Sequence, residues 1–303
     1  MLNLAWVRTF LALVENKSFQ AASEQLQIAQ PTVSQQIRKL EQQLGVLLLR
    51  RLRSGCEPTA AALAFLPYAE SLIRINRRAL EAIRTDHLRV GASSNVGIYL
   101  LQPYVRTFLR DRDPALFDLV IDRNPVIAQK LDDRELDIAV MEWWDRRPGF
   151  LWSGWRREPL VLIVAPDHPF AAFTQISKDE LATLDLLGGE PGTGTGRLLE
   201  SYFGDGRPRP RVSLQLGSTE AVKQAVKAGL GVSLVLRCAV AEEVRSGSLC
   251  AIRIGQPDLE KDLFVIWRNA GVSYMSTPAF VTHLIGRRAA PETPTRRPQT
   301  APL

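Results

Sequence analysis

The chain has 303 residues, 46% hydrophobic and 23% charged, which is an ordinary globular composition and enough sequence for two or three domains. Three Cys residues without a CxxC pair and three scattered His residues exclude a disulfide framework and the common zinc motifs, so we expect neither a metal site nor a cofactor. The first residues lack the pattern of a secretory signal, and no apolar stretch reaches the length of a membrane span. We therefore expect a cytoplasmic protein with no membrane partner.

The net charge of +6 is unevenly distributed along the chain. Residues 1–85 contain eleven Lys and Arg against six Asp and Glu, and residues 286–303 contain four Arg against one Glu. The long segment between them is mildly acidic. A basic N-terminal module on an acidic body indicates that the N-terminal part meets a polyanion such as DNA.

Residues 4–44 predict three helices in a small module. The first covers residues 4–15, and two more follow within 21–44 on either side of a tight turn at 27–29. The apolar stripe of the last helix repeats at spacings of four, three and four, through Val33, Ile37, Leu40 and Leu44. Gly45 then ends this helix, as glycine commonly does. The spacing predicts a helix-turn-helix with a polar outer face.

The polar face of the last helix has the residue types that read DNA. Amides can bond adenine edges, Arg can bond guanine, and Ser or Thr can bond bases or phosphates. The candidate DNA-binding residues of this helix are Gln30, Pro31, Thr32, Ser34, Gln35 and Arg38, of which Pro31 shapes the first turn. An ordinary amphipathic helix pair with a solvated face is the alternative.

Residues 46–57 predict a short strand-turn segment that carries Arg50, Arg51 and Arg53. Three arginines at a hairpin tip suit phosphate contacts or insertion into a minor groove. Directly after a helix-turn-helix, this segment is typical of a wing, although a solvated turn is the plainer alternative.

Residues 59–84 predict one long helix. Leu66, Ile73 and Leu80 repeat every seven residues, and a second series lies three residues further on, at Ala69, Asn76 and Ile83. Such a heptad seam is typical of a helix that pairs with a copy of itself. The alternative is a helix that lies on its own domain.

From Leu88 onward, strands and helices alternate, as in an α/β domain. The expected strands are 88–92, 117–121, 136–141, 160–165, 184–188, 212–216, 231–235, 249–254 and 262–267, with helices to about 110 and at 125–132, 196–203, 219–228 and 277–286. This order predicts two similar halves that exchange segments near residues 165 and 265. Residues 287–303 are rich in Pro and lack apolar periodicity, so we expect a disordered tail.

Polar residues gather where these expected strands end and helices begin. In open α/β sheets, ligands bind outside the carboxyl ends of strands, and helix N-termini favour anions. The sequence therefore predicts a site for a small anion, and the candidate residues are Ser93, Ser94, Asn95, Glu142, Thr193, Gly194, Thr195, Ser218 and Thr219. The alternative is that these hydroxyls serve only as helix caps, and Glu142 could equally be structural.

At this point the chain resembles the LysR-type transcriptional regulators. The pattern AAxxLxxxQPxxSxxIxxLExxLG runs from Ala21 to Gly45, and Arg51 stands where the family closes an LFxR motif. The segments 190–195 and 217–220 resemble two turns of the family's effector domain, so that the resemblance covers about residues 2 to 285. There are departures: Ala29 stands where Ser or Thr usually caps the reading helix, Leu49 replaces Phe, and Pro58 and Ala62 replace Leu and Gly.

The resemblance implies the whole architecture. We expect a winged helix-turn-helix at 1–58, a dimerisation helix at 59–86, and an α/β effector domain at 87–286 that is similar to periplasmic binding proteins. Its two subdomains would be 87–164 with 266–286, and 165–265. The implied partners are an interrupted palindrome of double-stranded DNA, a small-molecule effector, and further copies of the chain in a homodimer or homotetramer; RNA polymerase is a further candidate.

Other functions have less support in the sequence. The run 192–196 fails both the dinucleotide fingerprint and the P-loop pattern, because Arg197 stands at the third glycine and no Lys follows Gly194. No nucleophile elbow, catalytic triad or pair of carboxylates stands out, so we expect no enzyme. The main alternative is a regulator that senses redox state through Cys238 and Cys250. The sequence leaves open the effector, the operator, and whether transcription rises or falls.

Overall fold

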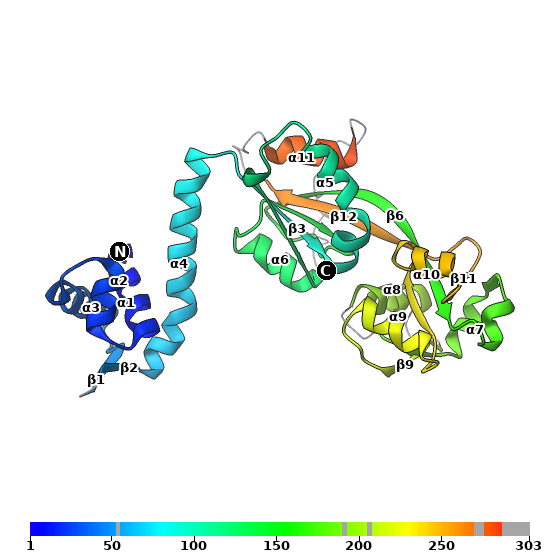
Figure 1. Cartoon of the computed structure of the whole chain (residues 1–303), viewed down its shortest axis with the longest axis horizontal. Helices are drawn as coiled ribbons and strands as arrows, with labels where there is room; N and C mark the ends of the chain where they lie inside the picture. Colours follow the sequence, from blue (N-terminus) through cyan, green and yellow to red (C-terminus); the bar gives the residue numbers. More distant parts are fainter. Residues whose placement is uncertain (53–54, 190–192, 205–207, 270–275, 287–303) are drawn as a thin grey trace, which may run out of the picture. The chain divides into compact units, whose positions relative to one another are not determined.

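The structure is a computed structural model that describes residues 1–52, 55–189, 193–204, 208–269 and 276–286. The chain forms two compact units, Met1–Thr85 and Asp86–Leu303, each of which is described by itself (Figure 1). The expected tail at 287–303 lies outside the described residues.

The first unit is a helical module with one small hairpin. Its elements are α1 (Leu4–Asn16), α2 (Phe19–Leu26), α3 (Gln30–Leu44), β1 (Leu49–Leu52), β2 (Gly55–Pro58) and α4 (Ala60–Arg84). The side chains of Asn3, Ser18 and Thr59 cap α1, α2 and α4. By contrast, α3 begins after Ala29 with no side-chain cap, as the sequence indicated. The winged helix-turn-helix expected from the sequence is therefore present.

The apolar stripes of the helices meet in one core. Phe10 and Leu13 of α1 pack with Val33, Ile37 and Leu40 of α3, and all five are buried. The ring of Phe65 on α4 lies 5.4 Å from the ring of Phe10. The same stripe that builds this core leaves the polar face of α3 outside it.

The hairpin is fixed to α3 and α1 by specific contacts. Glu41 of α3 accepts hydrogen bonds from the backbone N–H groups of Leu48 and Leu49, at 2.8 and 3.1 Å. Gly55 has a φ of +149°, and a Cβ there would lie 2.3 Å from the carbonyl oxygen of Lys17. Only glycine fits this close approach, and the N–H of Cys56 donates to the same oxygen at 2.9 Å, so the wing is held by α3 at its start and by the end of α1 near its turn.

Helix α4 differs from the simple seam that its sequence suggested. Ala69 is fully buried, and Leu66 and Ile73 pack against the same core, so much of the predicted seam covers the helix's own unit. A second apolar stripe has heptad spacing and includes Tyr68 and Ile75, which are 70% and 44% exposed. Its positions are Ala61, Phe65, Tyr68, Leu72, Ile75 and Ala79. Phe65 of this second stripe packs on the core beside Phe10, so the part that the unit leaves open to a partner is Tyr68, Leu72, Ile75 and Ala79.

The second unit is an α/β structure with two lobes. We define lobe I as residues 86–159 and 260–286, and lobe II as residues 160–259. The elements of lobe I are β3 (Leu88–Ser93), η1 (Val96–Leu100), α5 (Gln102–Phe108), η2 (Pro114–Leu116), β4 (Phe117–Asp122), α6 (Asn124–Asp132), β5 (Ile138–Met141), the first part of β6 (Phe150–Val164), β12 (Glu260–Arg268) and α11 (Ser276–Ile285). Those of lobe II are the end of β6, η3 (Pro169–Ala172), β7 (Gln175–Ile176), α7 (Lys178–Ala182), β8 (Asp185–Leu187), α8 (Gly194–Phe203), β9 (Arg211–Leu214), α9 (Thr219–Lys227), β10 (Ser233–Leu236), η4 (Arg237–Val240), α10 (Ala241–Ser246) and β11 (Cys250–Ile254).

Alternation along the strands builds a core on each face of the sheet. Ile138 and Val140 of β5 face the cluster that includes α5 and α11, whereas Ala139 and Met141 face the cluster that includes α6. Figure 1 shows α5 and α11 on one side of the strands of lobe I and α6 on the other. In lobe II, the end of β6 alternates in the same way between the clusters of α8 and α9.

Strands β6 and β12 connect the two lobes. Residues 150–159 of β6 pair with β12 in lobe I, and residues 160–164 pair with β10 and β11 in lobe II. The exchange therefore occurs at 159–160 and 259–260, about five residues before the positions expected from the sequence. The reason is that β6 continues through both lobes as one strand, so no loop marks the passage.

Three further differences have local causes. The first part of β6 was not predicted, because Arg156 and Arg157 interrupt its apolar alternation. The single helix expected to follow Ser94 is instead the π-helical η1 followed by α5, with Pro103 at the start of α5. The short elements β7, α7 and α10 fell in segments without a long apolar period.

The core of the first unit yields a stability prediction. Phe10 is fully buried, so Phe10→Ala should lower the free energy of unfolding by about 3–5 kcal/mol through lost contacts and a cavity. Chemical denaturation followed by circular dichroism measures this change. Leu47→Ala is the matched control, because Leu47 is 70% exposed in the same unit and its truncation should cost less than about 0.5 kcal/mol. Equal losses in the two variants would show that the core is placed wrongly.

Candidate functional site

The outer face of α3 presents the candidate residues predicted on that helix. Gln30, Pro31, Gln35 and Arg38 are exposed, and Thr32 and Ser34 are half-buried. The neighbouring Gln36 is instead used internally, since its amide oxygen accepts a hydrogen bond from Thr9 Oγ1 at 2.5 Å. The side chains of Gln30, Gln35 and Arg38 form no hydrogen bond or ion pair with any other described residue. They are therefore available to an external partner.

The wing arginines are only partly described. Arg50 lies on β1 and is exposed. Arg51 also lies on β1, but its side chain is outside the description, and Arg53 lies outside the described residues altogether. Arg50 is thus the candidate phosphate contact whose position supports the sequence-based expectation.

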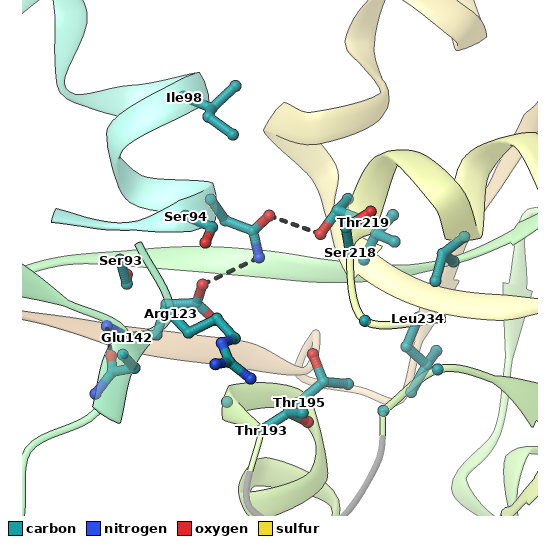
Figure 2. Close-up of a pocket in the computed structure, with 18 of the residues that line it drawn as sticks. Ser93, Ser94, Ile98, Arg123, Glu142, Thr193, Thr195, Ser218, Thr219 and Leu234 are labelled. Carbon is teal, nitrogen blue, oxygen red and sulfur yellow. Dashed lines mark hydrogen bonds between the residues drawn. The ribbon is translucent and has the colours of Figure 1, made fainter. Parts of the chain in front are cut away.

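A cavity of about 450 Å³ lies between the lobes of the second unit. It opens where β3, β4, β5 and β8 end, which is the edge at which open α/β sheets bind ligands. All nine candidate residues that the sequence placed at strand ends line it: Ser93, Ser94, Asn95, Glu142, Thr193, Gly194, Thr195, Ser218 and Thr219. Figure 2 shows how these side chains face one another across the cavity. Among the positions of the family-like turn at 190–195, those at 190–192 lie outside the described residues.

Three helices of eight residues or more begin at this cavity. The side chain of Thr193 caps α8 by accepting from Gly196 N at 3.0 Å, and Ser218 caps α9 by accepting from Ala221 N at 3.2 Å. The third is α6, whose N-terminus at Arg123 has no side-chain cap. The sequence predicts a long helix after Asn95 at this cavity, but that segment is the five-residue η1, and α6 is the third helix instead. Helix N-termini have partial positive charge, so their convergence favours an anion.

A chain of hydrogen bonds crosses the cavity from one lobe to the other. Thr219 Oγ1 donates to Asn95 Oδ1 at 2.7 Å, and Asn95 Nδ2 donates to Glu142 Oε1 at 3.0 Å, as drawn in Figure 2. Lys261 Nζ then contacts Glu142 Oε2 at 2.6 Å and Thr195 Oγ1 at 3.3 Å. Asn95, Glu142 and Lys261 belong to lobe I, whereas Thr195 and Thr219 belong to lobe II. Several of the candidate residues are therefore connected by hydrogen bonds as well as lying near one another.

Two polar groups of the cavity remain without a partner among the described residues. Ser93 is 2% exposed, and its hydroxyl makes no hydrogen bond. The side chain of Arg123 extends into the cavity and forms no ion pair or hydrogen bond with another described residue (Figure 2). A buried unpaired hydroxyl costs free energy, so Ser93 favours a polar occupant, and the positive charge of the exposed Arg123 favours a negatively charged one.

Sequence analysis missed Lys261 and Arg123. Lys261 had a detectable signal, because it stands at the same alternate positions of β12 as Leu263 and Val265, and all three are buried. A charged residue at a buried alternate position points to a buried ion pair. Arg123 follows β4 directly, but only the fold shows that β4 ends beside β3, which pairs with β5 on its other side.

The surroundings of Cys238 keep its thiol protonated. Burial, together with the nearby carboxylate of Glu158, raises the pKa of the Cys238 thiol to about 12. The reactive species is the thiolate, so a thiol with this pKa is almost entirely protonated at neutral pH. Cys250 is half-buried against the core of lobe II. The geometry therefore lends no support to the redox alternative.

Comparisons with known proteins identify the family. Residues 83–288 match the LysR substrate binding domain, and residues 4–63 match the bacterial regulatory helix-turn-helix protein of the lysR family. The chain is 52% identical over 196 residues to the putative HTH-type transcriptional regulator protein PtxE of Stutzerimonas stutzeri, which covers 64% of this chain and all of that protein. It is 32% identical over 282 residues to the HTH-type transcriptional regulator CbbR of Rhizobium meliloti, which covers 90% of each chain.

A solved structure supports the same fold across both units. Full-length CbnR complexed with its target DNA has a TM-score of 0.69 at 22% identity, covering 93% of this chain and 99% of that chain. The two matching domains together span nearly all of the described residues and join a DNA-binding module to a ligand-binding one. The chain belongs to the LysR family of transcriptional regulators, which bind DNA and respond to a small-molecule effector.

Proposed function

We propose that the effector of this regulator is a small anion that binds in the cavity between the lobes. The observation that carries the proposal is the convergence of three helix N-termini, the unpaired Arg123 and the buried, unpaired Ser93 hydroxyl on one cavity. A carboxylate, sulfate or phosphate ester satisfies all of these groups at once. Its size is limited by the cavity volume of about 450 Å³.

The DNA-reading surface would be the outer face of α3 with the wing. Gln30, Gln35 and Arg38 would contact base edges, with Thr32 and Ser34 beside them, and Arg50, Arg51 and Arg53 would contact the backbone or the minor groove. Pro31 shapes the entrance of the helix. Two copies related by a twofold axis would present two such helices, so the operator would be an interrupted palindrome.

Dimerisation would use the second apolar stripe of α4, defined above by its six positions. A long helix with apolar residues at heptad spacing pairs with a copy of itself. A tetramer formed through effector domains, and contact with RNA polymerase, are further assemblies that the family allows. Because regulators of this family act on DNA, we place the protein in the cytoplasm.

A catalytic activity is not part of the proposal. No group of three or more His, Cys, Asp or Glu side chains in the described part of the chain could hold a metal ion. No helix in those ranges is long and apolar enough to cross a membrane.

The polar groups of the cavity are suited to holding an anion. Binding there would act by favouring one of two assembly states, because the anion would have a different affinity for each state.

The DNA-reading face yields a prediction about specificity. Gln35→Ala should relax base preference at one position of each half-site by about 1–3 kcal/mol, because the amide reads a base edge. Arg50→Ala should instead weaken binding to all sequences and reduce the salt slope by about 1. Sequencing of fragments selected from a randomised DNA pool, together with salt titrations, measures both effects.

Gln43→Ala is the matched control for this experiment. Gln43 lies on the same helix, but its amide donates to the backbone oxygen of Met1 at 2.5 Å. Base preferences that change with Gln43→Ala and not with Gln35→Ala would place the reading face elsewhere on α3.

The two apolar stripes of α4 yield a prediction about dimerisation. Ile75→Glu should raise the dimer dissociation constant by at least about tenfold, because it places a carboxylate in each half of the interface. Leu80→Glu is the matched control, since Leu80 is 50% exposed but belongs to the stripe first predicted from the sequence. Sedimentation equilibrium measures both. If Leu80→Glu dissociates the dimer and Ile75→Glu does not, the first stripe is the dimer interface.

The cavity yields a prediction about anion binding. Thr195→Trp should weaken the binding of sulfate and of small carboxylates by at least about tenfold, because the indole fills the space in front of α8. Thr183→Trp is the control, since Thr183 is an exposed residue of lobe II that does not line the cavity. Isothermal titration calorimetry against a panel of anions measures the affinities. Anion binding that survives Thr195→Trp unchanged would remove this cavity from consideration.

A further inference from the structure

A buried ion pair that no sequence motif predicted lies beside the cavity: Glu142 lines the cavity, and Lys261 lies behind it. Glu142 follows β5 and Lys261 lies on β12, and their side chains are 9% and 4% exposed. The distance between Glu142 Oε2 and Lys261 Nζ is 2.6 Å. Two charges at this depth are costly to desolvate, and each is retained because the other compensates it.

The surroundings of the Glu142 carboxylate are those of a bound anion. Besides Lys261, its other oxygen accepts from the amide of Asn95 at 3.0 Å. The first turn of α8 packs directly against it, since a Cβ on Gly194 would lie 2.6 Å from Glu142 Oε2 and 3.2 Å from Lys261 Nζ. An ammonium group, an amide donor and a helix N-terminus thus surround one carboxylate.

Nearby donors of the same cavity are not used by the protein. The Ser93 hydroxyl is buried and has no partner among the described residues, and Arg123 has no counter-ion among them. The protein's own carboxylate therefore occupies one anion position, while other groups that favour an anion stay unsatisfied.

We propose that Glu142 is a tethered competitor of the effector. The anionic group of the effector takes the place of the Glu142 carboxylate beside Lys261 and the N-terminus of α8, and Glu142 turns away. This proposal rests on the proposed function, because it assumes that the cavity binds an anion. It assigns Lys261 as the cation that selects a carboxylate or a phosphate ester. It also makes effector binding an exchange of one anion for another, which lowers the affinity and breaks the contacts of Glu142 with Lys261 and Asn95.

The test measures the affinity of the full-length protein for sulfate by isothermal titration calorimetry. Glu142→Gln should bind sulfate at least about tenfold more tightly than the unaltered chain, because the competing charge is gone. Glu220→Gln is the charge-matched comparison. Glu220 lines the same cavity but is 58% exposed and pairs with Lys223 at 2.8 Å, so this variant measures the general effect of removing one negative charge. We expect its affinity to change by less than about threefold.

A second variant tests the role of Lys261. Lys261→Met alone would leave Glu142 buried without a partner and risks unfolding, so the double variant Glu142→Gln with Lys261→Met removes both charges together. It should bind sulfate at least about tenfold more weakly than Glu142→Gln. Circular dichroism establishes that each variant is folded.

The outcomes separate this proposal from the one on which it rests. Equal gains for Glu142→Gln and Glu220→Gln, or full affinity in the double variant, would overturn the exchange. If the unaltered chain binds sulfate and Thr195→Trp abolishes that binding, the proposal of an anion-binding cavity is supported even when the exchange with Glu142 is disproved. If no folded variant binds sulfate or any small carboxylate, both proposals fail together.

Discussion

The pairing of β6 with β12 is the constraint on which the second unit depends. β6 is one strand that contributes to the sheets of both lobes, and β12 begins where the passage between them occurs. The strand ends of the two lobes are thereby directed at a common cavity. Lys261 lies on β12 opposite Glu158 of β6, so the cation of the buried ion pair is placed by the same pairing. The passage between the lobes, the position of the cavity and the position of the ion pair therefore all depend on the pairing of β6 with β12.

The first unit divides its tasks by helix face. In α3 the apolar residues Val33, Ile37 and Leu40 are buried in the core, so the polar face of the helix is exposed to solvent. Glu41, at the edge between these faces, fixes the start of the wing. In α4, Leu66, Ala69 and Ile73 of the first stripe cover the core, whereas Tyr68 and Ile75 of the second stripe are exposed. A two-sided helix of this kind can position the reading module and join two copies at once.

Periodic patterns predicted much of this structure from the sequence. The stripe of α3 was readable because it repeats over several turns, and β5 was readable as a short, continuous apolar run. The nine candidate residues at strand ends do gather at one cavity, since parallel strands end at a common edge. What could not be read depends on long-range pairing. The passage of β6, the approach of α6 to the cavity, and the contact of Lys261 with Glu142 join residues that are far apart in the chain. In α4 the sequence contains two heptad stripes, and only the core of the first unit shows which one is already used.

The central claim is that an anion in the cavity and DNA on α3 are linked through two assembly states. Linkage is reciprocal, so the most direct test is to measure the affinity for sulfate, or for a small carboxylate that binds, in the free protein and in the protein saturated with a selected operator fragment. We predict that operator DNA changes the affinity for the anion by at least about fivefold, in either direction. Equal affinities in the presence and absence of operator DNA would contradict the claim, because a ligand that binds both states equally shifts neither of them.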